Sequence, residues 1–257
     1  MKNKNIFIHI KFFVFITIIA LSGNSAVADD FHFVGTPFPQ ILNKKDNGEI
    51  GGLGPEIVRT IAEKLGHGVK IQVVPFSRAL SMIENGQADA FIGPYKNAKR
   101  EKYMQYSKLP FYQDQISFYS KKDNSFIWNG DFSSLKGMNI GINRGWSYGS
   151  DFDRAKKNLA VYNAETLKAN FQKLLNNRID LFVCHPRGAL SAISKLKIAD
   201  KIQRLLPPIT VNNGYFAFSR KRKIEKFINA FDAEIDKMVA NGELAKLRKK
   251  HKVDDVE

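Results

Sequence analysis

The apolar residues of this chain follow helical and extended spacings in alternation. In residues 52–66, "GLGPEIVRTIAEKLG", apolar side chains recur every three or four positions and Pro55 suits a first turn, which predicts an amphipathic helix. Residues 69–74 are rich in β-branched side chains and predict a strand. Ser77 is expected to cap the next helix. The order of strand, helix, strand, helix and strand up to about residue 95 predicts an α/β layer in which helices cover a sheet.

A second unit repeats this alternation in the middle of the chain. The expected elements are a strand over residues 138–142, a helix near 151–157, a strand over 160–162 and a helix over 166–175. A later strand over residues 215–219 leads into a long helix whose apolar face runs from Ile224 to Met238. The pattern therefore predicts two α/β units of similar order.

Two stretches of the chain resemble one another. Residues 84–96 read "ENGQADAFIGPYK" and residues 175–187 read "LNNRIDLFVCHPR", each with an Asn-led turn, an Asp and a short strand that stops near a Pro. Corresponding strands of two lobes would explain the repeat, and ligands bind beyond the carboxyl ends of strands in such sheets. The extended residues 114–118 and 213–218 suit a two-stranded hinge, so a cleft between two lobes is expected.

The composition adds an indication of export. The 257 residues are 44% hydrophobic and 25% charged, as in ordinary globular chains. Three lysines precede the apolar run 12–21, and the small residues 25–28 have an A-x-A arrangement, so residues 1–28 are expected to form a secretory signal cut after Ala28. The apolar run is too short to span a bilayer. Subtracting these three lysines from the formal charge of +15 leaves +12.

The excess of positive charge does not indicate nucleic acid, because the basic residues are spread along the chain without a basic stripe and interleaved aromatics. An anionic surface or an acidic ligand remains compatible with it. Cys184 is the single cysteine, so it forms no intrachain disulfide and is expected to be buried. The histidines show no metal-ligand spacing, and neither a metal nor a cofactor is expected.

Six segments carry a resemblance to a known family. In chain order they are "GEIGGLGPEIVRTIAEKLG", "PFSRALSMIENGQADAFIG", "KNAKREKYMQYSKLPFY", "LKGMNIGINRGWSYG", "LLNNRIDLFV" and "VANGELAKLRKKH". From about residue 30 to residue 250 the chain resembles the bacterial extracellular solute-binding proteins of family 3, the periplasmic receptors of polar amino acid importers. The resemblance implies an α/β fold of two lobes, the type II periplasmic-binding-protein fold, joined by two hinge strands. The expected division is a signal peptide over residues 1–28, a first lobe over 29–114 and 214–257, and a second lobe over 115–213.

The resemblance implies that Arg100 grips a ligand carboxylate, because it stands six residues before Tyr106 and Ser107, as the family's arginine does before its Phe-Ser. A guanidinium is always charged and offers a planar fork to two carboxylate oxygens. Asn97 replaces the Thr of the family motif and keeps a side chain that can hydrogen-bond, and the backbone near Tyr95 is expected to add donors. The alternative is a surface arginine among lysines.

Aromatic and polar residues are expected on both walls of the cleft. Phe38 and Phe76 match positions where the family sandwiches the apolar part of its ligand, and two core side chains are the alternative. Arg78, near a helix start, points either into the cleft or to solvent. In the second lobe, Ser147 lies at a helix N-terminus that suits an anion, and Trp146 either lines the cleft or packs the lobe.

His185 departs from the family pattern. The family places an Asp at this position, five residues after the one that Asp180 matches, and that Asp pairs with the ligand ammonium. An imidazole cannot take this role, because a cation repels an ammonium and a neutral ring offers one ordinary hydrogen bond. Either another acid such as Asp151 or Glu165 meets the ammonium, or the ligand is an anion without an ammonium.

The sequence thus predicts an exported, periplasmic, monomeric protein that captures a small polar, carboxylate-bearing solute, an amino acid or related compound, and delivers it to the permease of an inner-membrane ABC transporter. A ligand-sensing module for a separate signalling partner is the alternative. A periplasmic dehydratase-type enzyme is less favoured, because Cys184 and His185 are neighbours on a strand, point to opposite faces and form no dyad. No catalytic residue is expected.

Overall fold

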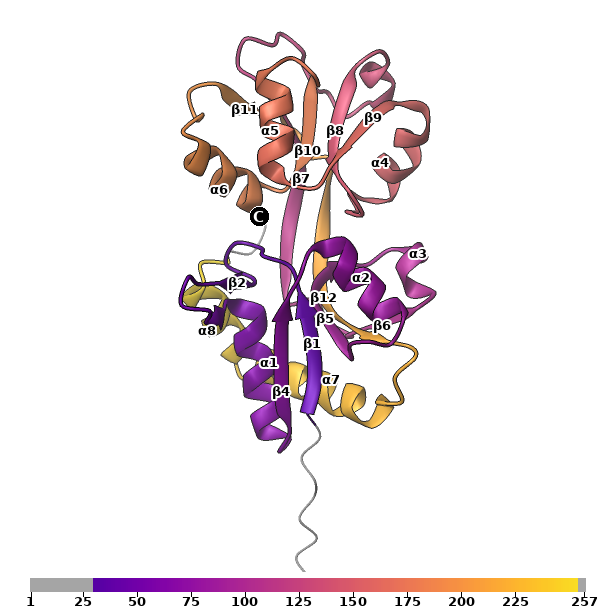
Figure 1. Ribbon diagram of the computed structural model, residues 1–257, viewed down its shortest axis with the longest axis vertical. Helices are drawn as coiled ribbons and strands as arrows, with labels where there is room; N and C mark the ends of the chain where they lie inside the picture. The colour runs from indigo at the N-terminus through magenta and orange to yellow at the C-terminus, as the bar shows by residue number, and fades with distance from the viewer. Residues whose placement is uncertain (1–29, 254–257) are drawn as a thin grey trace, which may run out of the picture.

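The computed structural model describes residues 30–253, which form two lobes joined by two long strands (Figure 1). Strands β7 (Tyr112–Lys121) and β12 (Thr210–Ser219) run antiparallel between the lobes, with Tyr112 opposite Gly214 and Ile116 opposite Thr210. They contain the two extended segments that the sequence predicted for a hinge. The prediction of a two-stranded connection is therefore confirmed.

The first lobe is built on a sheet of order β4-β1-β5-β12, with β6 also paired to β12. Its remaining strands are β1 (Asp30–Gly35), β4 (Gly68–Val73), β5 (Ala90–Tyr95), β6 (Met104–Tyr106) and the small hairpin β2 (Asn43–Lys44) and β3 (Ile50–Gly51). Its helices are α1 (Leu53–Lys64), α2 (Phe76–Glu84), α3 (Ala98–Glu101), α7 (Glu225–Ala240) and α8 (Glu243–Lys250). Strands β4, β1 and β5 are parallel, as a β-α-β order requires.

The second lobe has the order β7-β10-β8-β9, with β11 on the other side of β7. Its further strands are β8 (Asn139–Asn143), β9 (Ala160–Ala164), β10 (Leu181–Cys184) and β11 (Ile202–Arg204). Its helices are α4 (Ser150–Ala155), α5 (Leu167–Leu175), α6 (Pro186–Leu196) and the short 3-10 turns η1 (Phe132–Leu135) and η2 (Lys156–Asn158). Thr166 caps α5 by accepting the backbone N–H of Ala169 at 3.1 Å.

The repeated sequence stretches occupy corresponding places in the two lobes. Strand β5 lies between parallel β1 and antiparallel β12, and β10 lies between parallel β8 and antiparallel β7. The Asp that precedes each of these two strands accepts a hydrogen bond from a backbone N–H of the neighbouring parallel strand. A carboxylate oxygen of Asp89 accepts the backbone N–H of His32 at 2.7 Å, and one of Asp180 accepts that of Asn139 at 2.7 Å. Each Asp therefore ties its strand to the neighbouring parallel strand.

The C-terminal segment returns to the first lobe, where α7 and α8 lie beside α1 (Figure 1). The buried face of α7 includes Phe227, whose ring stacks on that of Phe31 with centroids 3.7 Å apart. Two side chains at the end of α8 contact the same carboxylate, since Lys250 and His251 lie 2.6 and 2.7 Å from Glu56. Burial of the aromatic face and these polar contacts hold the segment on the first lobe.

Some predictions from sequence need correction or lie beyond the structure. Ser77 does not cap α2, because it lies inside the helix and Pro75 occupies the N-cap. Helix α6 was not predicted; the Pro read as a break instead opens a helix. The exact lobe boundaries stay a prediction, and the signal segment 1–28 lies outside the described residues. No helix within residues 30–253 is long and apolar enough to cross a membrane.

Candidate functional site

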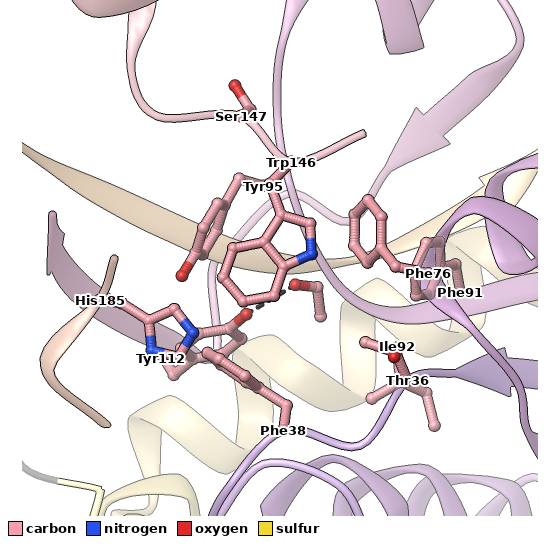
Figure 2. Close-up of a pocket in the computed structure, with 11 residues that line it drawn as sticks. Thr36, Phe38, Phe76, Phe91, Ile92, Tyr95, Tyr112, Trp146, Ser147 and His185 are labelled. Carbon is pink, nitrogen blue, oxygen red and sulfur yellow. Dashed lines mark hydrogen bonds between the residues drawn. The ribbon is translucent and has the colours of Figure 1, made fainter. Parts of the chain in front are cut away.

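A small cavity lies between the lobes. Its walls come from both sides: Thr36, Phe38, Phe76, Phe91, Ile92, Gly93, Tyr95 and Tyr112 face Trp146, Ser147 and His185 (Figure 2). The cavity volume is about 30 Å³, which is room for about two water molecules. An amino acid is larger than this, so a solute can enter only if the lobes separate or side chains shift.

His185 lies where β10 ends and α6 begins. Its Nδ1 accepts a hydrogen bond from the backbone N–H of Gly188 at 2.9 Å, so the side chain is the N-cap of α6. Because Nδ1 accepts, the proton of the neutral ring lies on Nε2. Burial of the ring, which is 1% exposed, and the charge of Arg187 lower the pKa of His185 well below its ordinary value. The imidazole is therefore neutral.

Three aromatic side chains surround this imidazole and the cavity. The ring of Trp146 stacks on His185, with centroids 5.2 Å apart and planes at 24°. Phe38 meets His185 edge-on at 4.3 Å, and Phe76 lies 6.3 Å from Trp146 (Figure 2). The contacts of Phe38 and Phe76 join the first lobe to the second. The structure brings Phe38, Phe76 and Trp146 together as walls of one cavity, and their contact with a ligand stays a prediction.

Arg100 is buried next to the cavity but does not line it. Its Nη1 donates to the backbone oxygen of Tyr95 at 2.5 Å, and its Nη2 donates to that of Gly145 at 2.8 Å. The guanidinium carbon lies 5.1 Å from the ring centre of Phe76. Asn97 caps α3 by accepting a hydrogen bond from the backbone N–H of Arg100 at 3.0 Å. Asn97 therefore helps to position Arg100 and is not part of the cavity wall. Arg100 thus bridges the two lobes through carbonyl oxygens.

A polar network behind the cavity was missed by the sequence analysis. Arg187 Nη2 donates to Asp114 Oδ1 at 2.9 Å, and Nη1 donates to Gln40 Oε1 at 2.5 Å. Tyr95 donates its hydroxyl to the other oxygen of Asp114 at 2.9 Å. Burial raises the pKa of Asp114 to about 6, although Arg187 and Tyr95 act to lower it. Burial and the neighbouring Asp114 raise the pKa of Tyr95, whose hydroxyl stays protonated.

The remaining predicted residues are more peripheral. Ser147 lines the cavity, and its hydroxyl donates to Asp153 at 2.8 Å. Arg78 is exposed on α2 and is not among the lining residues. Asp151 and Glu165, the candidate partners for an ammonium, form ion pairs with arginines at exposed positions away from the cavity. They do not supply a carboxylate to it.

The chemistry of the cavity is therefore unusual for a site that binds a charged solute. None of its lining residues is Asp, Glu, Lys or Arg. Its aromatic walls offer contact area, and most of its hydroxyls already have partners: Tyr112 donates to the oxygen of Gly93 at 2.6 Å, and Tyr95 and Ser147 donate as described. Within residues 30–253, no three His, Cys, Asp or Glu side chains gather where they could hold a metal ion.

Two lobes, a pair of connecting strands and a cavity between the lobes define the two-lobed class of periplasmic binding proteins. The chain belongs to the bacterial extracellular solute-binding proteins, family 3, whose family model matches residues 34–254. The resemblance noted in the sequence and the fold it implied are both confirmed.

Individual relatives are distant. The "Probable amino-acid-binding protein YxeM" of Bacillus subtilis (strain 168) is 21% identical over 91% of this chain and 89% of its own length. The "Arginine-binding extracellular protein ArtP" of the same organism is 23% identical over 80% of this chain and 79% of its own. A solved substrate-binding protein of an amino acid ABC transporter has 23% identity and a TM-score of 0.71, and the match covers 86% of this chain and 98% of that one. A histidine kinase sensor domain has a TM-score of 0.74 at 17% identity, over 86% of this chain and 95% of that one.

Proposed function

We propose that this protein captures a small carboxylate-bearing solute, an amino acid or a related compound, between its two lobes. The observation that carries the proposal is the interlobe cavity, whose walls come from both lobes beside the connecting strands. A solute held there contacts both lobes at once. Closure is then favoured by contacts that neither lobe makes alone, which is how a hinged protein couples binding to its conformation.

Arg100 is the residue proposed to hold the carboxylate. In the structure its fork is satisfied by the neutral carbonyl oxygens of Tyr95 and Gly145. A carboxylate forms stronger, charge-assisted hydrogen bonds with a guanidinium than a carbonyl does. We infer that a bound solute takes the place of the Gly145 oxygen, while Phe76 beneath the guanidinium and Asn97 at its backbone keep Arg100 in position.

Delivery to a transporter is the proposed role of the captured solute. Membership of a solute-binding family and likeness to a binding protein of an amino acid ABC transporter support this role. The protein would act as an exported monomer in the periplasm, with residues 1–28 as its signal, and dock on the permease of the inner membrane. No reaction step is proposed, since capture and release need only the cleft.

Sensing is the second candidate function. The same fold occurs in a histidine kinase sensor domain, which supports a module that reports a solute to a signalling partner. Both candidates share the capture step and differ only in the partner. Genes for a permease and an ATPase beside the coding sequence support transport, whereas a gene for a sensor kinase supports sensing.

Calorimetric titration of the purified chain without residues 1–28 tests the capture step. The ligands are the common L-amino acids and a set of small carboxylates, with uncharged amides of the same skeletons as controls. At least one carboxylate is expected to bind with a defined stoichiometry of one, and small-angle scattering is expected to show a change in radius of gyration upon binding. Binding of none of these compounds, or equal binding of an amide and its acid, contradicts the proposal.

A further inference from the structure

The Nε2–H group of His185 is a hydrogen-bond donor without a partner. Its atom is fully buried, and no hydrogen bond to it exists among the described residues. The hydrogen bond from Gly188 fixes Nδ1 as an acceptor, so the ring cannot turn its proton away without losing the helix cap. His185 lines the cavity beside Trp146 and Phe38 (Figure 2). An unpartnered buried donor costs about 1–3 kcal/mol, which an acceptor atom on a solute would recover.

The Nε2–H group of His185 offers no acceptor to an ammonium. An ammonium is itself a donor, so it cannot satisfy Nε2–H. Asp114, the buried carboxylate of the network behind the cavity, does not line the cavity and already accepts hydrogen bonds from Arg187 and Tyr95. Burying an ammonium without an acceptor or an opposite charge is costly. At His185 the cavity therefore favours a hydrogen-bond acceptor over the ammonium of a zwitterionic α-amino acid.

The cavity walls between the Arg100 side and His185 are flat and apolar. Trp146, Phe76 and Phe38 present rings to the cavity, and polar lining groups other than His185 are mostly satisfied within the protein. Aromatic rings stack well on flat apolar groups. Arg100 lies over Phe76 beside this aromatic space, and His185, with its unpartnered Nε2–H donor, is part of the wall.

We propose that the cleft selects a carboxylate without an ammonium group, whose flat apolar body lies among the aromatic side chains and whose distal oxygen accepts a hydrogen bond from His185 Nε2. The assignment rests on the proposed function, because it presumes that Arg100 holds the carboxylate. In it, His185 is the residue that determines specificity. Aromatic or unsaturated acids with a distal hydroxyl or carbonyl oxygen fit this description.

Matched pairs of compounds test the assignment. The pairs are 3-(4-hydroxyphenyl)propionate with L-tyrosine, 3-phenylpropionate with L-phenylalanine, and glutarate with L-glutamate, each pair differing only in the ammonium group. The chain without residues 1–28 is expected to bind at least one acid about tenfold or more tightly than its amino acid. The distal hydroxyl is expected to strengthen binding of the first acid relative to the second by at least about fivefold.

Variants at residue 185 separate recognition from folding. His185→Asp keeps a side chain that caps α6 and supplies an acceptor for an ammonium, so it is expected to reverse the preference within the pairs. His185→Asn keeps a cap and is expected to retain the preference with weaker binding. Thermal unfolding of each variant reports whether the fold survives.

The outcomes are distinct. Tighter binding of the amino acids by the unchanged protein, or no effect of His185→Asp on the preference, overturns the inference and leaves the proposed function standing. If neither the unchanged protein nor the folded His185→Asp variant binds any acid or amino acid of the panel, the inference and the proposed function both fail.

Discussion

Arg187 Nη2 lies 2.9 Å from Asp114 Oδ1, and this ion pair joins helix α6 of the second lobe to the connecting strand β7. Both side chains are largely buried, with 11% and 3% of their area exposed. The same guanidinium reaches Gln40 of the first lobe. One arginine therefore fixes the second lobe against both the hinge and the first lobe, and burial of the pair reduces the screening of its charges by water.

The carboxyl of Asp114 should make stability depend on pH. Burial raises its folded-state pKa to about 6, against about 3.9 in an unfolded chain. The native state thus binds more protons than the unfolded state between about pH 4 and pH 6, so the stability contributed by this group is greatest below pH 4 and falls as the pH rises through that window. The loss amounts to about 3 kcal/mol for a shift of about two pKa units.

Asp114→Asn isolates this effect, because its amide oxygen still accepts from Arg187 and its NH2 group can donate to the hydroxyl oxygen of Tyr95, while the amide does not ionise. The free energy of unfolding in urea is measured for both proteins at pH 4 and pH 7. The unchanged protein is expected to lose stability relative to the variant between these two values. A difference that stays constant from pH 4 to pH 7 would show that the carboxyl of Asp114 titrates normally.

Gly188→Ala tests how His185 is held. A Cβ at this position would lie 2.4 Å from Cε1 and 2.8 Å from Nε2 of His185, far inside contact distance. The imidazole must move, and the hydrogen bond that caps α6 is lost with it. We expect a loss of about 1–2 kcal/mol in the free energy of unfolding, measured in urea.

Leu190→Ala in the same helix is the matched control, since Leu190 is 65% exposed and should change stability by about 0.5 kcal/mol at most. A Gly188→Ala variant as stable as this control would mean that the imidazole has room that the structure does not show.

The fold of this chain was largely predictable because its local signals agree. Helical spacing in residues 52–66 and a Gly before the helix produce α1, and the N-cap Gly52 has a φ of 111°, which favours glycine. The two repeats predicted corresponding strands because Asp89 and Asp180 each precede a short apolar run. Local spacing and short-range hydrogen bonds decide these features, so they are visible in a single sequence.

The arrangement of the candidate site was harder to predict from the sequence, because it depends on how the two lobes contact each other. Arg187 and Asp114 are 73 positions apart, and nothing local predicts their contact. The same holds for Arg100, whose partner Gly145 belongs to the other lobe. One signal was present and misread: His185 followed by proline is an N-cap residue followed by a residue suited to the first turn, and it begins α6.

Cys184 should be unreactive in the folded protein. The thiol is fully buried, and burial raises the pKa of Cys184, so almost no thiolate is present at neutral pH. A colorimetric disulfide reagent is expected to react with less than about one tenth of the protein in native buffer and with one thiol per chain in denaturant. Rapid native labelling would show that the core around β10 opens to solvent.

Arg100→Lys distinguishes charge from geometry in the proposed carboxylate site. The arginine donates from two nitrogens to oxygens of Tyr95 and Gly145, one on each side of the cleft. A lysine keeps the positive charge but is a single point donor on a flexible chain, and it loses the flat face that lies over Phe76. Binding of the best carboxylate found by calorimetry is therefore expected to weaken by about ten- to a hundredfold, the loss of one charged hydrogen bond.

Arg59→Lys is the control, because Arg59 also donates to a backbone oxygen, that of Ile50 at 2.9 Å, but lies outside the cavity and should leave affinity unchanged. Equal affinities for both variants would exclude the fork of Arg100 from recognition and leave the aromatic walls and His185 to hold the solute.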